Sequence, residues 1–446
     1  MSAVASWAAD FKARAPALPG ANLPWLAALR KRAIDRFGAE GWPTRRKENW
    51  HHTSLAFMEE QVFSATGTHA DPAAIVARLR AGETTPGHWL VFVAGHHAPA
   101  LSAIGALPAG ARLISLADAL AQADDATASA IEQTFGSSDD GDSPAALNAA
   151  FATDGAFIHL ARGLALEETI HLVFIAGADE ASRHLRNLVV AEAGSRATIV
   201  EHYPDSGDAA TLTNVVTRID AGADTNISHL KLQQEGELAT HIARLDTQQA
   251  RGAALASHSL SFGARLARHD ICTRFDGEGG EVLLNGLYHV DGRRHVDHQT
   301  RIEHASPRCN SREFYRGLVD DNARGVFAGR IIVAQDAQRS DAMQRCDNLL
   351  LSRQAEADAR PELEIYADDV KCAHGATVGQ IDDDSLFYLR SRGLDELHAR
   401  HLLTYAFAAE ALARIELPTL RQRAREALLA RLPGADALGE MLEELA

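Results

Sequence analysis

Four short runs between residues 170 and 219 decide the fold: Ile170-His-Leu-Val-Phe-Ile175, Asn187-Leu-Val-Val190, Ala197-Thr-Ile-Val200 and Val215-Val-Thr-Arg-Ile219. Each run is rich in β-branched or other apolar residues and is separated from the next by Gly, Asp or Asn, which is the pattern of short β-strands. Similar runs continue as far as Leu363-Glu-Ile-Tyr366, and almost no helical periodicity interrupts them. A βαβ arrangement is therefore excluded.

Two architectures fit such a region: a sandwich or barrel of hairpins, or a solenoid of stacked strands. The runs recur about every 25–30 residues, as the coils of a loose repeat do. The hairpin dipeptide Asn-Gly occurs only at Asn285-Gly286. Both observations favour a parallel β-helix, in which neighbouring coils supply each other's core. We predict a mainly β chain with this core over residues 151–389.

Helical patterns flank the predicted core. We expect an N-terminal helical or mixed domain over residues 1–150, with helix starts at Asn22-Leu-Pro24 and Ser143-Pro144. Apolar residues recur at helical spacing after the first start, at Leu26, Leu29, Ala33 and Phe37. A short buried strand is expected at Trp89-Leu-Val-Phe-Val93.

A C-terminal helical domain is expected over residues 390–446. Asp395 and Glu396 suit the first turn of a helix. One face of this helix is predicted to carry Leu394, Leu397, His401, Leu402 and Tyr405. After Pro418, residues Leu420–Leu432 predict a second, basic amphipathic helix, and an acidic tail ends at Ala446.

Composition narrows the function classes. The 446 residues include 44 Lys and Arg against 60 Asp and Glu, which gives a net charge of −16. Nucleic acid is therefore not expected as the principal partner. No apolar run is long enough to span a membrane, and the N-terminus lacks the pattern of a secretory signal. The four cysteines are far apart, so we expect no disulfide framework and a reducing, cytoplasmic setting.

Motifs of common enzymes are missing from the sequence. It contains no G-x-x-x-x-G-K-[ST] loop, no strand-linked G-x-G-x-x-G, no G-x-S-x-G elbow and no H-E-x-x-H. Any ATPase in the same process would have to be another chain. We expect a protein that is not itself an enzyme.

The 21 histidines raise the question of a metal site. The adjacent pairs His51-His52 and His96-His97 are poor joint ligands, because neighbouring side chains point in different directions. On a strand, His295 and Asp297 would share one face and His298 would take the other. A stacked polar ladder is favoured here over a metal site.

The best local candidate for chemistry is Val370-Lys-Cys-Ala-His-Gly-Ala-Thr-Val378. On a strand, Cys372 and His374 share one face, and a thiolate with an imidazole suits zinc, copper or an iron–sulfur species. Two ligands do not complete a metal site, and a buried cysteine beside a hydrogen-bonded histidine is the plain structural alternative. Cys272, Cys309 and Cys346 are expected to be ordinary core residues.

The same segment carries a family resemblance. Asp368-Asp-Val-Lys-Cys-Ala-His-Gly-Ala-Thr-Val-Gly379 and Leu386-Phe-Tyr-Leu-Arg-Ser-Arg-Gly393 resemble the SufB/SufD family of the SUF iron–sulfur cluster assembly system, and its SufD branch in particular. Gly325-Val-Phe-Ala-Gly-Arg-Ile-Ile-Val333 and Pro43-Thr-Arg-Arg-Lys-Glu-Asn-Trp50 are similar to the same family. His51-His52 departs from the family pattern, which usually has a basic and an aromatic residue there.

The resemblance implies a right-handed parallel β-helix between two helical domains, and a non-catalytic scaffold in a SufB–SufC–SufD complex. The implied partners are a SufB paralogue, paired through the β-helices, and a SufC ATPase on the C-terminal helical domain, where the helix Leu420–Leu432 and its neighbour are expected to form the docking surface. His374 matches the family histidine at the SufB–SufD interface, and Cys372 is its neighbour on the same face. Both are implied ligands of a transient iron–sulfur cluster, and no tightly bound cofactor is expected.

Two other functions stay open at this point. A β-helix enzyme acting on polysaccharides is one, although such enzymes are usually secreted and this sequence pairs no carboxylates convincingly. A homodimeric scaffold without a cluster role is the other, since β-helix edges can pair with a second copy of the same chain.

Overall fold

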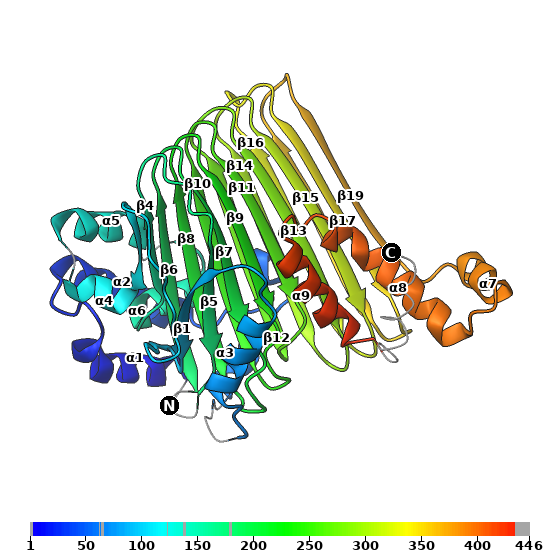
Figure 1. The fold of residues 1–446 in the computed structure, drawn as a ribbon, viewed down its shortest axis with the longest axis horizontal. Helices are drawn as coiled ribbons and strands as arrows, with labels where there is room; N and C mark the ends of the chain where they lie inside the picture. Colours follow the sequence, from blue (N-terminus) through cyan, green and yellow to red (C-terminus); the bar gives the residue numbers. More distant parts are fainter. Residues whose placement is uncertain are drawn as a thin grey trace.

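The computed structural model describes residues 3–61, 63, 67–122, 124–136, 140–177 and 181–432. These residues form a parallel β-solenoid of about eight turns with helices at both ends (Figure 1). The predicted mainly β fold with a parallel β-helix core is therefore confirmed. Among the described residues, no helix is long and apolar enough to cross a membrane.

Two sheets run along the solenoid, and successive strands of the chain alternate between them. The ten-stranded sheet contains β1 (Gly87–Val93), β2 (His96–His97), β5 (Thr169–Ile175), β7 (Arg196–Tyr203), β9 (Asn226–Gln233), β11 (Ala254–Ser261), β13 (Glu281–Val290), β15 (Asn310–Val319), β17 (Asp341–Leu350) and β19 (Lys371–Gly379). The nine-stranded sheet contains β3 (Ala111–Ser115), β4 (Ala156–Leu160), β6 (Ser182–Ala191), β8 (Leu212–Ala221), β10 (Thr240–Gln249), β12 (Leu266–Phe275), β14 (His295–His304), β16 (Arg324–Val333) and β18 (Glu356–Ile365).

The strands stack in register because equivalent residues of successive turns pair directly. Nearly all pairs are parallel, and the antiparallel exceptions, β1 with β2 and β3 with β4, lie at the first end. Side chains alternate between the interior and the two outer faces. One interior column of the ten-stranded sheet runs through Ala197, Ile227, Leu255, Val282, Ser311, Ala342 and Cys372.

The interior also buries polar groups, chiefly in the early turns. The Glu201 carboxylate accepts hydrogen bonds from the Tyr203 hydroxyl at 2.8 Å and the Thr217 hydroxyl at 2.5 Å. Glu235 lies 2.7 Å from the His241 ring, and the Lys231 ammonium is buried near both carboxylates. Such groups are tolerated inside a protein only when they are paired and hydrogen-bonded.

Most of the N-terminal helices lie at the first end of the solenoid (Figure 1), whereas residues 48–50 lie over β16 and β18 and residues 72–81 pack on the outer face of β1 and β5. The N-terminal helices are α1 (Ala3–Arg14), η1 (Ala15–Ala17), α2 (Pro24–Glu40), η2 (Glu48–Trp50), η3 (Ala56–Glu59), α3 (Pro72–Ala81), α4 (Leu116–Gln122), α5 (Asp125–Phe135) and α6 (Ser143–Phe151). The apolar face predicted for α2 is buried, and the strand predicted at Trp89–Val93 is β1.

Both predicted helix starts are confirmed, although neither Asn22 nor Ser143 caps its helix with its side chain. Helix α2 starts at Pro24 with Leu23, rather than Asn22, at its N-cap. Helix α6 has Asp142 at its N-cap, while the Ser143 hydroxyl donates instead to the Gly41 carbonyl at 2.6 Å. The Ser143 hydroxyl therefore makes a tertiary hydrogen bond instead of capping α6.

The C-terminal helices are α7 (Asp383–Ser391), α8 (Glu396–Leu412) and α9 (Pro418–Leu429). Helices α8 and α9 lie across the outer face of the ten-stranded sheet, and α7 extends beyond the last turn (Figure 1). The face predicted for α8 is partly wrong: His401 is buried, but Leu397 is 51% exposed. The predicted acidic tail lies outside the described residues.

The described strands begin before the predicted core boundary at residue 151, since β1 and β3 extend the two sheets. Helix α7 begins before the predicted boundary at residue 389. How the chain divides into independently folding domains is a separate property, so the division into residues 1–150, 151–389 and 390–446 stays a prediction.

Candidate functional site

The last turn of the solenoid is its open end. Strands β18 and β19 end the two sheets, so each pairs with a neighbour on only one side. Nearly every residue of β19 is exposed, in contrast to the buried strands behind it. The unpaired backbone N–H and C=O groups of such edge strands can bind another strand.

Cys372 and His374 lie in β19, where period two predicted that they share a face. Cys372 pairs in register with Ala342 and packs against the interior cluster, so it continues the interior column described above. His374 pairs in register with the buried Gln344 and is itself exposed. Because alternate residues of a strand share one side, both side chains belong to the interior columns, at the rung where the interior opens.

The Cys372 thiol is half-buried. Burial raises the pKa of this thiol, and the nearby Asp341 carboxylate adds to the increase, whereas a backbone hydrogen bond with Ala342 lowers it. A neutral thiol is a poor metal ligand, so Cys372 would have to lose its proton on binding a metal.

The other three cysteines differ from this one. Cys309 and Cys346 are buried, as predicted. Cys272 is not a core residue: it pairs in register with Asp246 and Arg301 on the outer face of the nine-stranded sheet and lines a surface hollow. Burial raises the pKa of Cys272 to about 11 and that of Cys346 to about 12, which keeps both thiols protonated.

The histidine-rich segment His295–His298 is a structural ladder. His295 Nε2 lies 2.8 Å from the Thr53 hydroxyl, which also donates to Asp297 at 2.5 Å. His298 points the other way and stacks on Tyr288, with ring centroids 5.5 Å apart. The predicted division between faces is confirmed. Among the described residues, no group of three or more His, Cys, Asp or Glu could hold a metal ion.

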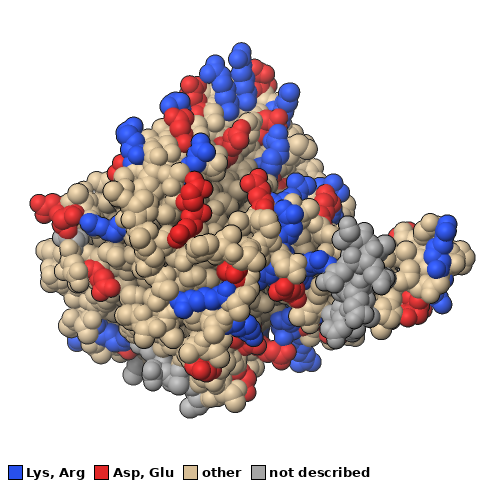
Figure 2. All heavy atoms as spheres, viewed as in Figure 1, with Lys and Arg blue, Asp and Glu red and all other residues tan. Residues whose placement is uncertain are grey.

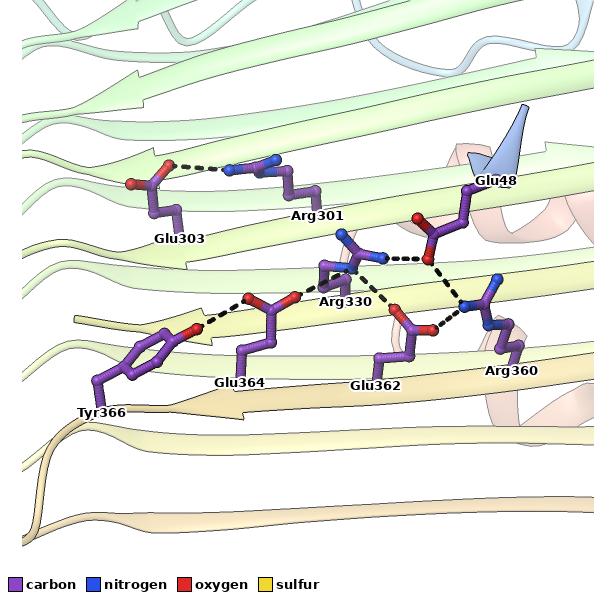
Figure 3. Close-up of polar contacts among 8 residues, drawn as sticks. All are labelled: Glu48, Arg301, Glu303, Arg330, Arg360, Glu362, Glu364 and Tyr366. Atoms are coloured by element: carbon purple, nitrogen blue, oxygen red, sulfur yellow. Dashed lines mark hydrogen bonds and ion pairs between the residues drawn. The ribbon is translucent and has the colours of Figure 1, made fainter. Parts of the chain in front are cut away.

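An ion-pair network covers the outer face of the last turns of the nine-stranded sheet (Figure 3). Arg330 of β16 lies 2.8 Å from Glu362 and 3.4 Å from Glu364 of β18. Glu48, from the segment that resembles the family near the N-terminus, reaches across to Arg330 at 3.3 Å and Arg360 at 3.1 Å. The N-terminal motif therefore contacts the end of the solenoid.

We call residues 43–55 the strap, because they cross the outer face of this sheet. The Trp50 ring lies over the Arg268 guanidinium at 3.6 Å, and its Nε1–H donates to Asp142 at 2.6 Å. The strap thus joins the N-terminal helices to strands β12, β16 and β18.

Residues 174–407 match the SufBD core domain of the SUF system for iron–sulfur cluster assembly, and residues 1–172 match the SufBD N-terminal region. This chain belongs to the SufBD family. The expected resemblance is confirmed over most of the chain.

Three relatives align over most of their own length and most of this chain. The iron–sulfur cluster assembly protein SufD of Escherichia coli is 33% identical, over 88% of this chain and 90% of the relative. An iron–sulfur cluster assembly SufBD family protein of Synechocystis is 31% identical, over 91% of each chain. A chloroplastic protein of Arabidopsis thaliana is 26% identical, over 92% of this chain and 86% of the relative.

Proposed function

We propose that this SufBD protein is the SufD-type scaffold of a SufB–SufC–SufD complex, in which His374 and Cys372 help to bind a nascent iron–sulfur cluster. The observation that carries the proposal is the placement of an imidazole and a thiol on one side of β19, at the open end of the solenoid. Two ligands from this chain leave the remaining positions to a partner. A divided, incomplete site suits a cluster that is assembled and then released.

The open edges of β18 and β19 would receive the SufB paralogue. Pairing there would cover the exposed residues of β19 and bring partner ligands towards His374. The SufBD match over most of the chain supports this assembly role over the polysaccharide-active enzyme considered from the sequence. A second copy of this chain could use the same edges, which keeps the homodimeric scaffold as an outcome of the binding test.

A His374→Ala variant co-expressed with SufB and SufC tests the ligand role. We expect cluster formation to slow by at least about tenfold, since even outer-shell changes at metal sites cost that much. The matched control is His96→Ala, which removes another exposed histidine, in β2 at the opposite end of the solenoid. Cluster formation at the normal rate in His374→Ala would refute the ligand role.

The surface proposed for the SufC ATPase lies on α7 and the start of α8. The apolar face of α9 is not available for this role, because Leu420, Ala424 and Leu428 pack on the ten-stranded sheet. Phe387 and Tyr388 are 73% and 56% exposed on α7, which projects from the body of the molecule (Figure 2). Large exposed apolar side chains grouped on a surface mark protein-binding sites.

The docking test is the double variant Phe387→Ala, Tyr388→Ala. We expect SufC to be lost from the purified complex while SufB is retained. Point variants are preferable to deleting residues after 393, because α8 covers buried residues of β13 and β15 and its removal would expose them. An Ile104→Ala variant, which removes an exposed apolar side chain elsewhere, is the control. Unchanged SufC binding in the double variant would refute this surface.

A further inference from the structure

Two buried polar residues lie directly behind His374 in the same interior column. His374 of β19 pairs in register with Gln344 of β17, and Gln344 pairs with Glu313 of β15. Gln344 is 2% exposed and Glu313 is 3% exposed. Neighbouring strands are about 4.8 Å apart, so the three side chains form a row that leads from the interior to the open end.

The Gln344 amide has a defined orientation. Its Nε2 donates to the Glu313 carboxylate at 2.5 Å. A carboxylate can only accept hydrogen bonds, so the amide nitrogen must face Glu313 and the amide oxygen must face elsewhere. Within the part of the chain that the structure describes, Gln344 Oε1 is buried and has no hydrogen-bond partner.

The opposite sheet holds this amide in place. A Cβ at Gly329 of β16 would lie only 2.2 Å from Gln344 Nε2 and 2.8 Å from the Thr300 hydroxyl oxygen. Glycine at this position leaves the space that the Gln344 amide occupies against the nine-stranded sheet. The packed, hydrogen-bonded amide cannot turn freely.

We propose that Gln344, oriented by Glu313, is a positioning residue for His374: its Oε1 accepts a hydrogen bond from one ring N–H and leaves the other ring nitrogen free to bind iron. This inference deepens the proposed ligand role of His374 and rests on it. Histidines that bind metals generally donate their second ring N–H to an oxygen acceptor, which fixes the tautomer and the ring orientation. Gln344 Oε1 is a buried acceptor on the adjacent strand.

The ionised form of Glu313 is the one that orients the amide. Burial raises the pKa of Glu313 to about 7, while hydrogen bonds from Thr300 and Gln344 lower it. The test is therefore made at about pH 9, where a carboxyl with this pKa is ionised and histidine side chains are generally neutral.

The tautomer of His374 is the direct readout. The full chain is labelled with ¹⁵N-histidine, and the His374 ring signals are identified by their absence from the His374→Ala spectrum. We expect one dominant tautomer in the wild type and an exchanging mixture in Gln344→Met. Glu313→Gln keeps the side-chain volume but lets the Gln344 amide turn, so this variant should also give a mixture of His374 tautomers. If Gln344→Met does not fold, Glu313→Gln serves as the test.

Gln233→Met is the matched control. Gln233 Nε2 donates to Glu235 at 3.1 Å in another buried Gln–Glu pair, but this pair lies in and beside β9, several turns from His374. The His374 tautomer should be unchanged in this variant. The same dominant tautomer in wild type, Gln344→Met and Glu313→Gln would overturn the proposal.

Cluster formation gives a second readout in the complete complex. Gln344→Met should slow it about tenfold, whereas the matched control Gln233→Met should leave the rate unchanged. The two proposals fail separately. A normal rate in His374→Ala would remove the ligand role but leave a measured change of tautomer intact, and unchanged tautomers would remove the positioning role alone.

Discussion

The two ends of the solenoid use the same residue type in opposite ways. At the first end, His171 of β5 is buried, stacks on Trp89 with ring centroids 4.0 Å apart, and lies 3.1 Å from His202. At the last end, His374 of β19 is exposed on an edge strand. The difference arises because helices and antiparallel strands cover the first turns, whereas no described strand pairs with the outer edge of the last turn. Whether a histidine is buried in the structure or exposed to a ligand thus depends on the turn of the solenoid in which it lies.

Acid should reveal this difference with the largest effect. Burial lowers the pKa of His171, His184 and His298 to about 3. Below the ordinary histidine pKa of about 6.5, the unfolded chain binds protons that the folded chain does not, so stability is complete above this pH and falls towards pH 3. Each such histidine contributes a loss of up to about 1.4 kcal/mol per pH unit. Urea unfolding at pH 7.5 and pH 5 measures the loss.

A few carboxyls with raised pKa values oppose this acid effect. The raised pKa of Glu313, about 7, means that the folded state takes up a proton there before the unfolded state does, so this carboxyl adds stability as the pH falls below 7. Burial also raises the pKa of Glu83, Asp154 and Asp270, but these carboxyls are outnumbered by the buried histidines whose pKa is lowered. Equal free energies of unfolding at the two pH values would contradict the expected balance.

Removing a buried charge from the covered turns should have the next largest effect. Burial alone would raise the pKa of Glu201, but hydrogen bonds and nearby positive charge, including that of Lys231, lower it to about 2. Glu201→Gln leaves the buried Lys231 with one carboxylate fewer, and we expect a cost of about 3–5 kcal/mol in unfolding free energy. Glu364→Gln on β18 is the control and should cost no more than about 1 kcal/mol. Equal costs would contradict the contrast between the two ends.

The strap gives an intermediate case. Trp50→Phe removes the indole N–H that donates to Asp142, and an acceptor left without its donor costs about 1–3 kcal/mol. Trp25→Phe is the comparison, because Trp25 packs against the Phe135 ring in the N-terminal helices. Chemical unfolding should show the larger loss for Trp50→Phe; the reverse order would show that the strap contributes through packing alone.

The smallest expected effect is at the tip of the strap. Glu48 pairs with Arg330 and Arg360 but is largely exposed, so Glu48→Gln should change the unfolding free energy by no more than about 1 kcal/mol. The small difference should shrink further in 1 M salt, because salt screens exposed charges. A loss above about 2 kcal/mol would show that the network in Figure 3 behaves as a buried one.

Much of the fold could be predicted from the sequence because it depends on local patterns. Strand runs separated by turn residues and recurring at 25–30 residues gave the solenoid, and period two placed Cys372 and His374 on one side of β19. Helix α7 was missed, although Asp382 caps it by accepting from the Ser385 N–H and two more aspartates fill its first turn. Those signals were present in the sequence.

Other features could not be predicted from the sequence of one segment, because they depend on which part of the chain packs against that segment. The outer position of Cys272 is an exception, because this residue shares one side of β12 with Arg268, Asp270 and Arg274, and that alternation could have predicted it. The apolar face of α9 needed a cover, and the sequence did not reveal that the solenoid itself supplies it. Glu313 precedes Gln344 by 31 residues, and Gln344 precedes His374 by 30 residues. These spacings match the repeat length, so they could have placed both residues in the column of His374.

The one-sided pairing of β19 also fixes where the molecule starts to open. In a stack of repeats each turn is held by its neighbours, and a terminal turn has one neighbour instead of two. Backbone amides should therefore exchange with deuterium fastest in β19 and progressively more slowly towards the middle turns. A partner bound at that edge would raise protection far beyond its own footprint, so assembly would control how long the whole subunit survives proteolysis in the cell.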